Sequence, residues 1–516
     1  MPDKAIFISI TFILVVLTFF SGLILINTFF GDPTIYLVYA KNIAQGDFFS
    51  FNPGEFSSGS TSPLWALILS ISFLFDNVNS AFLSKIISCS STIIALIISF
   101  ISLLLITKHR IGGIAGTFTI AYFLIIPGIM LYESSLIIIL ISCLILLFFK
   151  IINDKDKSPF SKFIFLTLIF SLIPLTRPDA STIILICFGG LIFHFQKTNQ
   201  KKYLLFSLIS FFISLIPSVL YYGYSYIQLG TFSVSSYCRS FALQENASEF
   251  LSIKYSLSSI KYFLISPKII YVLMAIWGIK KITYFYKDKS LVYFAIISII
   301  SYFIILTFIS PVTVDSDRYI LPVIPFFGLA ISIFIKDTFE HTTNKNTIII
   351  FLLIFVIGYP LYTIIPSVFH NRSRGLNFDT IVEKNIIHTI NSFAEPNSKI
   401  LVYEVQDRFY LRPDITLISL DGITDGKVAP YLKSGDMYSF LLKYKPDYWL
   451  ANDAVNYRPY LKNSVLNKVF NKFVGKRNNS ISFGNITIEK IKENEKSNPI
   501  GFASYRALFK LNYKNH

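Results

Sequence analysis

Residues 134–152 read SSLIIILISCLILLFFKII, and Lys150 is the only charged residue among them. A helix needs about 20 predominantly apolar residues to cross the hydrocarbon of a bilayer, so this run is long enough to span a membrane. Similar runs recur along the first 366 residues, whereas charged residues become frequent in the tail. The sequence therefore predicts a polytopic α-helical membrane domain over residues 1–366 and a water-soluble domain over residues 367–516.

Composition and charge support the same class. Of the 516 residues, 53% are hydrophobic and 15% are charged, which is more apolar surface than a soluble chain can bury. The net charge of +16 comes mostly from short loops and the tail, where membrane orientation explains it better than a nucleic-acid partner. No pair of cysteines has the spacing of a disulfide framework or a zinc site; they are Cys89, Cys143, Cys187 and Cys238.

Length and hydropathy predict about eleven transmembrane helices. The run 5–30 is too long for the apolar part of a signal peptide, so we expect an uncleaved first span. The run 64–75 has only about 12 residues, too few to cross, and should be re-entrant or lie on the surface. The predicted spans are residues 5–30, 80–107, 111–131, 134–152, 161–176, 180–196, 203–222, 266–285, 290–310, 319–336 and 347–366.

Basic residues predict the orientation. With a cytoplasmic N-terminus, every strongly basic short loop falls on the cytoplasmic side, as the positive-inside rule requires. These loops contain Lys108 and Arg110, Lys155 and Lys157, Lys197, Lys201 and Lys202, Lys280, Lys281, Lys287 and Lys289, and Lys336 and Lys345. We therefore expect a multi-pass protein of the plasma (inner) membrane with a cytoplasmic N-terminus and an extracytoplasmic C-terminal domain.

The same orientation places the other ionisable groups outside. Charged groups at a membrane edge are costly and usually functional, so their gathering on one face predicts an outward-facing active site. They lie in outer loop 31–79, in outer loop 223–265 and at three hairpin ends, and they are Asp32, Glu133, Arg177, Asp179, Arg239, Asp317 and Arg318.

The first outer loop begins with Asp32, a good N-cap residue, and Pro33, which suits a first helical turn. The residues that follow predict an amphipathic helix at the outer interface, stopped by Gly46. Beyond it stand Asn52-Pro53-Gly54-Glu55 and Thr61-Ser62-Pro63-Leu64-Trp65. Helix capping alone would explain Asp32, and a turn would explain Glu55. The loop is nevertheless too long, and its Pro, Gly, Asn and Trp residues are too distinctive, for a simple connector.

This loop resembles the first outer loop of the C-type glycosyltransferases, membrane enzymes that take sugar from a polyprenyl-phosphate carrier. Bacterial arabinofuranosyltransferase- and mannosyltransferase-like members open with Asp-Asp-Ala-Tyr-Ile-x-x-Arg-Tyr-Ala-Arg-Asn and continue with Asn-Pro-Gly-Glu and Thr-Ser-Pro-Leu-Trp. The matches here are Asp32, Ile35, Tyr39, Ala40, Asn42 and the two later segments, with Lys41 in place of an Arg. Gly31 replaces the first Asp and Val38 replaces an Arg.

The resemblance continues at low density along the chain. Its ordered segments are specific for the family and uninformative about the sugar. They are Tyr132-Glu133-Ser134, Thr176-Arg177-Pro178-Asp179, Gly230-Thr231-Phe232 through Tyr237 and Arg239, Asp317-Arg318-Tyr319 with Pro322 and Pro325, Asp421-Gly422 and Pro446-Asp447-Tyr448.

The resemblance implies transfer of a sugar from a polyprenyl-phosphate donor to a cell-envelope glycan, lipid or protein. Asp32 is our predicted general base. The predicted ligands of the donor phosphate are Arg239, Arg318, Arg177 and Lys41. The residues expected to bind the acceptor or shape the site are Glu133, Glu55, Asn52, Trp65, Tyr237 and Tyr319.

Each of these residues also has a purely structural explanation. Arg177 with Asp179, and Arg318 with Asp317, could be ion pairs at helix ends, Glu133 a polar turn, and Arg239 a solvated charge. We predict no cofactor and no metal; a divalent cation shared by Asp32 and Glu133 is the alternative.

The tail predicts a small α/β domain that caps the active site or binds the acceptor. Its expected helices are 379–393 and 437–445, and its expected strands are 399–404, 415–420 and 447–451. Two other functions stay open, a glycan polymerase or ligase that uses a diphosphate-linked oligosaccharide, and a lipid or solute transporter. A transporter would usually show internal repeats and mid-span charges, and Lys85 is an exception among nearly uncharged spans.

Overall fold

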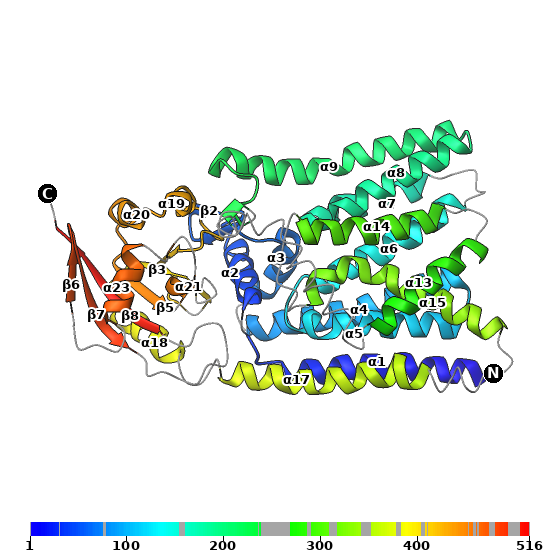
Figure 1. The fold of residues 1–516 in the computed structure, drawn as a ribbon, viewed down its shortest axis with the longest axis horizontal. Coiled ribbons are helices and arrows are strands. Elements are labelled where there is room, and N and C mark those ends of the chain that lie inside the picture. Colours follow the sequence, from blue (N-terminus) through cyan, green and yellow to red (C-terminus); the bar gives the residue numbers. More distant parts are fainter. Residues whose placement is uncertain are drawn as a thin grey trace. The chain divides into compact units, whose positions relative to one another are not determined.

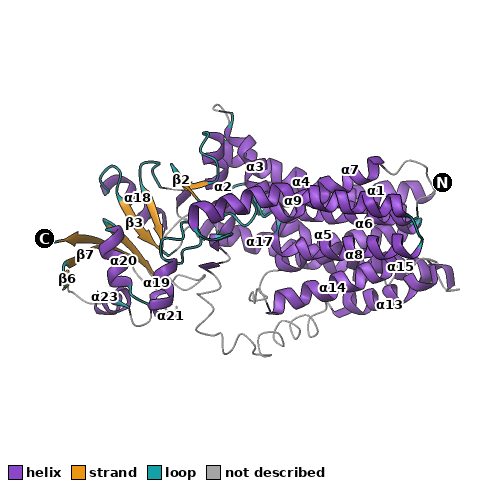
Figure 2. Ribbon diagram, turned by 90° about the horizontal axis from the view of Figure 1, so that it is seen from above, coloured by secondary structure: helices purple, strands orange, loops and turns teal. Residues whose placement is uncertain are grey.

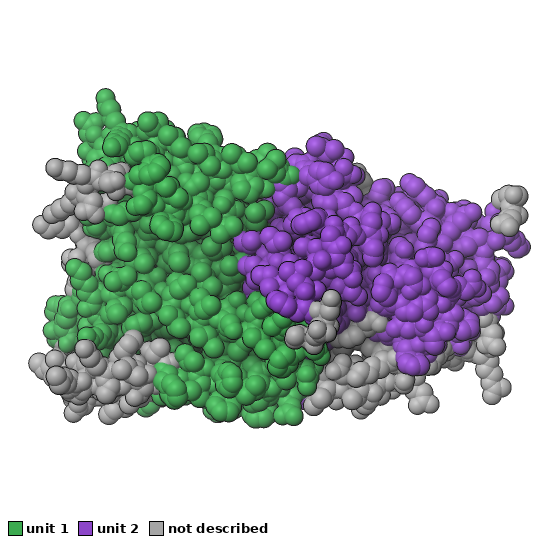
Figure 3. Space-filling view, turned by 180° about the vertical axis from the view of Figure 1, so that it is seen from behind, with its two compact units in different colours: residues 1–27, 77–220, 251–372 green, residues 28–76, 221–250, 373–516 purple. Residues whose placement is uncertain are grey.

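The computed structural model describes most of the chain in two compact units. Figure 3 colours them separately: unit 1 contains residues 1–27, 77–220 and 251–372, and unit 2 contains residues 28–76, 221–250 and 373–516. The described residues are 2–29, 31–75, 79–153, 160–235, 237–238, 269–285, 290–308, 317–341, 352–377, 383–403, 408–409, 411–452, 454–457, 461, 464–473, 480–493 and 506–514.

Unit 1 is helical, and its long helices run roughly along one direction (Figure 1). The helices are α1 (Pro2–Ile24), α4 (Ser80–Thr107), α5 (Arg110–Ile129), α6 (Ser134–Ile152), α7 (Phe160–Thr176), η2 (Pro178–Ala180), α8 (Ser181–Lys197), α9 (Lys201–Leu229), α13 (Ile269–Phe285), α14 (Ser290–Phe308), η3 (Asp317–Val323), α15 (Ile324–His341), the π-helix η4 (Leu352–Gly358) and α17 (Tyr359–Asn377).

Each predicted span overlaps one of these helices, because an uninterrupted apolar run of this length has its backbone hydrogen bonds satisfied only as a helix in lipid. Within the described residues, six helical segments are long and apolar enough to cross a membrane. The number of eleven spans stays a prediction. The run 64–75 forms α3 (Pro63–Ser70) and the 3-10 helix η1 (Ile71–Phe73), which together are too short to cross, as predicted.

Small residues let the helices of unit 1 approach closely. The helix α15 packs against α5 and α13, and α4 packs against α5 and α6. A side chain on Gly278 of α13 would overlap the Ala330 carbonyl of α15, and one on Gly116 of α5 would overlap the Gly328 carbonyl. Close helix crossings at glycine are typical of helix association within membranes.

Unit 2 contains all the described strands (Figure 2). Its six-stranded sheet has the order β4-β3-β5-β8-β7-β6, parallel among the first three strands and antiparallel among the rest. The strands are β3 (Lys399–Val402), β4 (Thr416–Ser419), β5 (Tyr448–Asn452), β6 (Ser480–Phe483), β7 (Ile486–Glu493) and β8 (Arg506–Tyr513), and a separate hairpin joins β1 (Ser50–Asn52) and β2 (Glu55–Phe56).

The sheet is a layer between two groups of helices. Alternate residues of a strand face opposite sides, so Trp449 of β5 joins one core and Leu450 joins the other. The Trp449 side packs on α20 (Met437–Tyr444) and α23 (Val465–Phe473), next to the short helix α19 (Ala429–Ser434). The Leu450 side packs on α18 (Glu383–Phe393) and on α2 (Asp32–Ala44), a helix of the first outer loop. A further short helix, α21 (Ala454–Tyr457), follows β5.

The predicted helices and strands of the tail are confirmed within a few residues, but β6, β7 and β8 were not predicted. The first outer loop also differs from the expectation. Val38, Tyr39 and Ile43, which we expected at the membrane interface, pack into the core beside α18. The predicted domains follow the chain and divide at residue 366, whereas the compact units follow contacts and join this loop to the tail.

Candidate functional site

Four segments of unit 1 meet at Arg177, which lies between α7 and η2 and is 5% exposed. Its Nε donates to Asp179 Oδ1 at 3.1 Å and its Nη2 donates to Asp179 Oδ2 at 2.8 Å. Its Nη1 donates to Glu133 Oε1 at 3.3 Å and to the Arg318 carbonyl oxygen at 2.9 Å. We call these residues, with Tyr302, the Arg177 cluster.

Tyr302 ties the fourth segment, α14, to the Arg177 cluster. Its hydroxyl donates to Asp179 Oδ2 at 2.6 Å and lies 2.8 Å from the Tyr319 carbonyl oxygen. Tyr302 is fully buried, and a buried tyrosine hydroxyl usually finds a hydrogen-bond partner. The cluster therefore holds the start of α6, η2, α14 and η3 together through a buried and hydrogen-bonded ion pair, the arrangement in which a buried charge is tolerated.

Arg318 has a different environment from Arg177. Its guanidinium lies 4.5 Å from the ring centre of Tyr132 and 4.7 Å from that of Tyr319, and its Nη2 donates to the Tyr319 hydroxyl at 2.7 Å. Arginine over aromatic faces is stabilised by the ring quadrupole and keeps its charge. Arg318 is half-buried, so a ligand can reach part of it, whereas Arg177 is enclosed by its partners.

Lys85, in the second turn of α4, is the second buried cation near the start of α6. It is 1% exposed, and its Nζ donates to the Ile129 carbonyl oxygen at the end of α5 at 3.4 Å. Lysine commonly caps the last carbonyls of a helix, which is the structural explanation of this contact. A charged side chain inside a membrane-spanning segment is also a frequent sign of function.

In unit 2, Asp32 lies in the first turn of α2 and is half-buried. The prediction that Asp32 is the N-cap is wrong, because the capping position is Gly31 with φ 76°, a conformation that glycine adopts without steric cost. A carboxylate in the first turn still interacts favourably with the helix dipole. Lys41 lies in the last turn of the same helix and is half-buried.

The Asn52–Glu55 turn fastens the outer loop to the edge of the sheet. Asn52 Nδ2 donates to the Leu417 carbonyl at 2.8 Å, and the Leu417 N–H donates to Asn52 Oδ1 at 2.9 Å, so the amide completes the edge strand β4 as another strand would. Lys427 Nζ donates to Glu55 Oε2 at 2.6 Å. Both contacts support a structural role for Asn52 and Glu55.

The structure thus brings some of the predicted residues together. It joins Glu133, Arg177, Arg318 and Tyr319 in unit 1. In unit 2, Trp65 is fully buried and Tyr237 is 39% exposed. Arg239 lies outside the described residues, and Asp32 and Arg318 belong to different units, so their predicted proximity stays a prediction.

The sequence did not single out Tyr302, Tyr132 or Lys85 as site residues. Tyr302 is hidden in an uninterrupted apolar run, and only its hydroxyl signals a need for a partner. The described residues contain no group of three His, Cys, Asp or Glu side chains suited to a metal, and the absence of a metal stays a prediction.

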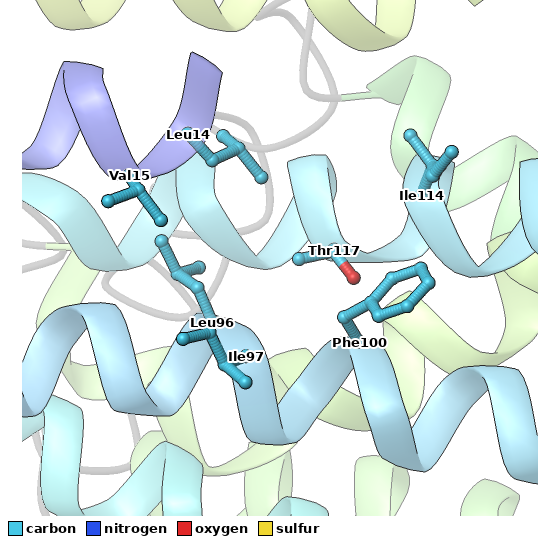
Figure 4. Close-up of a pocket in the computed structure, with 7 residues that line it drawn as sticks. All are labelled: Leu14, Val15, Leu96, Ile97, Phe100, Ile114 and Thr117. Atoms are coloured by element: carbon cyan, nitrogen blue, oxygen red, sulfur yellow. The ribbon is translucent and has the colours of Figure 1, made fainter. Parts of the chain in front are cut away.

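A separate pocket between α1, α4 and α5 is lined almost entirely by apolar side chains and contains no ionisable group (Figure 4). Its volume is about 20 Å³, enough for one water molecule. Thr117 supplies the only polar side chain, and its hydroxyl donates to the Gly113 carbonyl at 2.8 Å. The lining residues are Leu14, Val15, Leu96, Ile97, Phe100, Ile114 and Thr117.

No protein-family model and no curated protein matches this sequence. Two crystal structures of ArnT from Cupriavidus metallidurans resemble this structure, each with a TM-score of 0.55 and 11% identity. The form bound to undecaprenyl phosphate aligns over 98% of this chain and 98% of ArnT, and the apo form over 99% and 98%.

The oligosaccharyltransferase of Archaeoglobus fulgidus, solved in complex with Zn and sulfate, gives a TM-score of 0.50 at 10% identity, over 85% of this chain and 68% of that one. Identities this low speak for the fold alone. The expected architecture, a polytopic helical membrane protein with a C-terminal sheet domain, is confirmed, and its fold is similar to that of ArnT along nearly the whole chain.

Proposed function

We propose that this chain is a membrane glycosyltransferase that moves a sugar from a polyprenyl-phosphate donor to an extracytoplasmic acceptor of the cell envelope. One observation carries the proposal: the fold is shared along nearly the whole chain with an ArnT structure bound to undecaprenyl phosphate. The motifs of the first outer loop support it from the sequence.

The reaction requires a base and a cation. The acceptor hydroxyl loses its proton as it attacks the anomeric carbon, and the bond from that carbon to the phosphate oxygen breaks. Asp32 is the proposed base, because a positioned carboxylate contributes typically about 10²–10⁴ in rate. Its place in the first turn of a buried helix supports this role, since the helix fixes the carboxylate.

The leaving phosphate needs positive charge aimed at its oxygens. Arg318 is the proposed ligand, because its guanidinium is held by two tyrosine rings and is still partly accessible. Arg177 is engaged by two carboxylates and a carbonyl, which favours a positioning role: it holds the backbone of Arg318.

The test is in vitro transfer from a panel of radiolabelled polyprenyl-phosphate pentoses and hexoses. Asp32→Asn keeps the size of the side chain and removes the proton acceptor; the lost helix-dipole interaction costs only about 0.3–1 kcal/mol. We expect normal folding, retained donor binding and a loss of turnover on the order of 10²-fold or more. Asp47→Asn is the matched control, because Asp47 lies in the same loop and its Oδ2 accepts from the Gly54 N–H at 2.6 Å.

Turnover of the Asp32→Asn variant within about threefold of wild type would move the base elsewhere, first to Glu133 and then to Glu55. A diphosphate-linked oligosaccharide donor belongs in the same panel. Transfer of a whole oligosaccharide in place of one sugar would favour the polymerase or ligase alternative.

The outward orientation is part of the proposal and has its own test. Lys201 and Lys468 are exposed in their respective units, so a cysteine at either position can be labelled without unfolding. In a background without the native cysteines, an impermeant reagent on intact cells should label Lys468→Cys and spare Lys201→Cys. The reverse pattern would place the C-terminal domain in the cytoplasm.

A further inference from the structure

Two cations of unit 2 share one region of the fold. Lys41 lies in the last turn of α2, and Arg408 lies in the segment between β3 and β4. Both segments contribute to the same hydrophobic core, through Ile43 from α2 and Leu411 from the Arg408 segment. Lys41 is half-buried, and Arg408 is 6% exposed.

The guanidinium of Arg408 is oriented but not neutralised. Its Nη1 donates to the Arg412 carbonyl at 3.0 Å and its Nη2 donates to the Pro413 carbonyl at 3.1 Å, and both acceptors are uncharged. Its buried Nε has no hydrogen-bond partner. The nearby carboxylate of Asp414 is engaged by Arg412, at 3.0 Å and 2.8 Å.

The two charges act on each other as well. Burial lowers the pKa of Lys41, and the positive charge of Arg408 lowers it further. Burial also lowers the pKa of Arg408, and the negative charge of Asp414 opposes that shift without reversing it. Among the described residues, neither side chain takes part in an ion pair. Folding therefore brings two like charges out of water, which is unfavourable unless an anion joins them.

We propose that Lys41 and Arg408 form a binding site for a phosphoryl oxyanion. Lys41 supplies the contact that solvent can reach, and Arg408 supplies a fixed positive charge behind it. A phosphoryl group suits such a pair, because it carries charge and several acceptor oxygens. The site lies in unit 2. Because the resemblance already assigns Lys41 to the donor phosphate, the proposal rests on the proposed function and adds Arg408 to it; its test measures the reactivity of an amine and not sugar transfer, so the two can fail separately.

The structural alternative is that Arg408 only anchors residues 412 and 413 while Lys41 is simply solvated. That alternative accounts for the two carbonyl contacts. It accounts neither for the unpartnered Nε nor for a second cation placed close enough to lower a pKa.

The test uses the reactivity of the Lys41 amine in the full-length protein. The protein in nanodiscs of phosphatidylcholine is pulse-labelled with acetic anhydride across a pH series, and each lysine is quantified by peptide mass spectrometry. Inorganic phosphate should raise the pKa of Lys41 and slow its labelling, by about tenfold for a rise of one pKa unit. Sodium chloride at equal ionic strength is the salt control, and the exposed Lys468 is the internal control.

The two sources of a phosphoryl group give different results. Protection by inorganic phosphate in phosphatidylcholine indicates a soluble phosphate or sugar phosphate, and protection only in nanodiscs containing phosphatidylglycerol indicates a lipid headgroup. Either result supports the site. Phosphate should also raise the melting temperature of wild type but not of Lys41→Gln, with Lys468→Gln as the matched variant. Labelling of Lys41 that changes no more than that of Lys468 in every condition would overturn the proposal.

Discussion

Asp425 should make the stability of unit 2 depend on pH. It lies in the turn after β4, where its Oδ2 accepts from the Ser419 N–H at 3.0 Å and its Oδ1 accepts from the Lys427 N–H at 3.1 Å. Burial raises the pKa of this carboxyl to about 6, and Asp421 adds to the rise while Lys427 opposes it. The folded state therefore binds a proton on Asp425 more tightly than the unfolded state does.

Proton linkage gives the direction and the size of the change in the stability of unit 2 with pH. A folded pKa of about 6 stands above the ordinary value of 3.8, so the stabilisation is fully present below about pH 3.8 and is lost as pH rises through about 6. The difference of about two pKa units corresponds to about 3 kcal/mol, with a slope of up to about 1.4 kcal/mol for each pH unit. Asp425→Asn should remove this slope, even though the amide keeps only one acceptor oxygen and lowers stability at every pH.

Hydrogen exchange followed by mass spectrometry is the assay, on peptides that cover β4 and β5 in the full-length protein between pH 4.5 and 7.5. The free energy of opening should fall from pH 5 to pH 7 in wild type and stay level in Asp425→Asn. Asp436→Asn is the matched control, because asparagine caps α20 as well as aspartate does. Hydrogen bonding from Ser439 lowers the pKa of Asp436, so this residue makes stability rise with pH, opposite to the effect of Asp425. If the free energy of opening changed with pH in the same way in wild type and in Asp425→Asn, Asp425 would not be the cause of the pH dependence.

Three further substitutions test the contacts that organise the two units. Arg177→Lys should raise the KM for the donor at least about tenfold, because lysine keeps the charge but cannot hold both oxygens of Asp179 and the Arg318 carbonyl at once; Arg412→Lys, in a half-buried pair of the same geometry, should leave the KM unchanged. If Arg177 acts through Arg318, the double variant with Arg318→Gln should be no worse than Arg318→Gln alone, and additive effects would argue against that. Gly278→Val should lower the melting temperature in detergent, since the new side chain overlaps the backbone of α15 and costs about 2–4 kcal/mol; an unchanged melting temperature would mean that α13 and α15 are farther apart than described. Asn52→Ala should speed hydrogen exchange in β4 by removing two hydrogen bonds of about 1 kcal/mol each, and unchanged exchange would show that the edge does not depend on them.

Local patterns predicted the helices of unit 1 well, because length and hydropathy decide them residue by residue. The later strands were missed for an equally physical reason. β7 reads ITIEKIKE, in which apolar and polar residues alternate only over the first four positions; Ile486 and Ile488 join the Trp449 core, and an irregularity between Lys490 and Lys492 then breaks the pattern. In a chain dominated by long apolar runs, this weak alternation was overlooked, although Ile486 and Ile488 are both buried.

The candidate site was predictable only in its local part. Arg177 and Asp179 are two positions apart, so their pairing could be expected from the sequence. Glu133 and Arg318 lie 44 and 141 positions from Arg177, and nothing in their neighbourhoods specifies that they meet. The periodicity of α2 likewise showed that one face is buried, but it did not show whether lipid or protein covers that face.

The packing of α2 assigns a task to the C-terminal domain. A helix of 13 residues is marginal in water by itself, so its position comes from what it packs against, which is α3 and η1 of the same loop together with the core on the Leu450 face of the sheet. Asp32 begins this helix and Lys41 lies in its last turn, about 14 Å apart at 1.5 Å for each residue. The outer loop and the sheet together therefore position both the proposed base and the proposed phosphoryl ligand. Changes at the sheet, such as opening of the Asn52 contact to β4, should then disturb Asp32 although they touch no substrate.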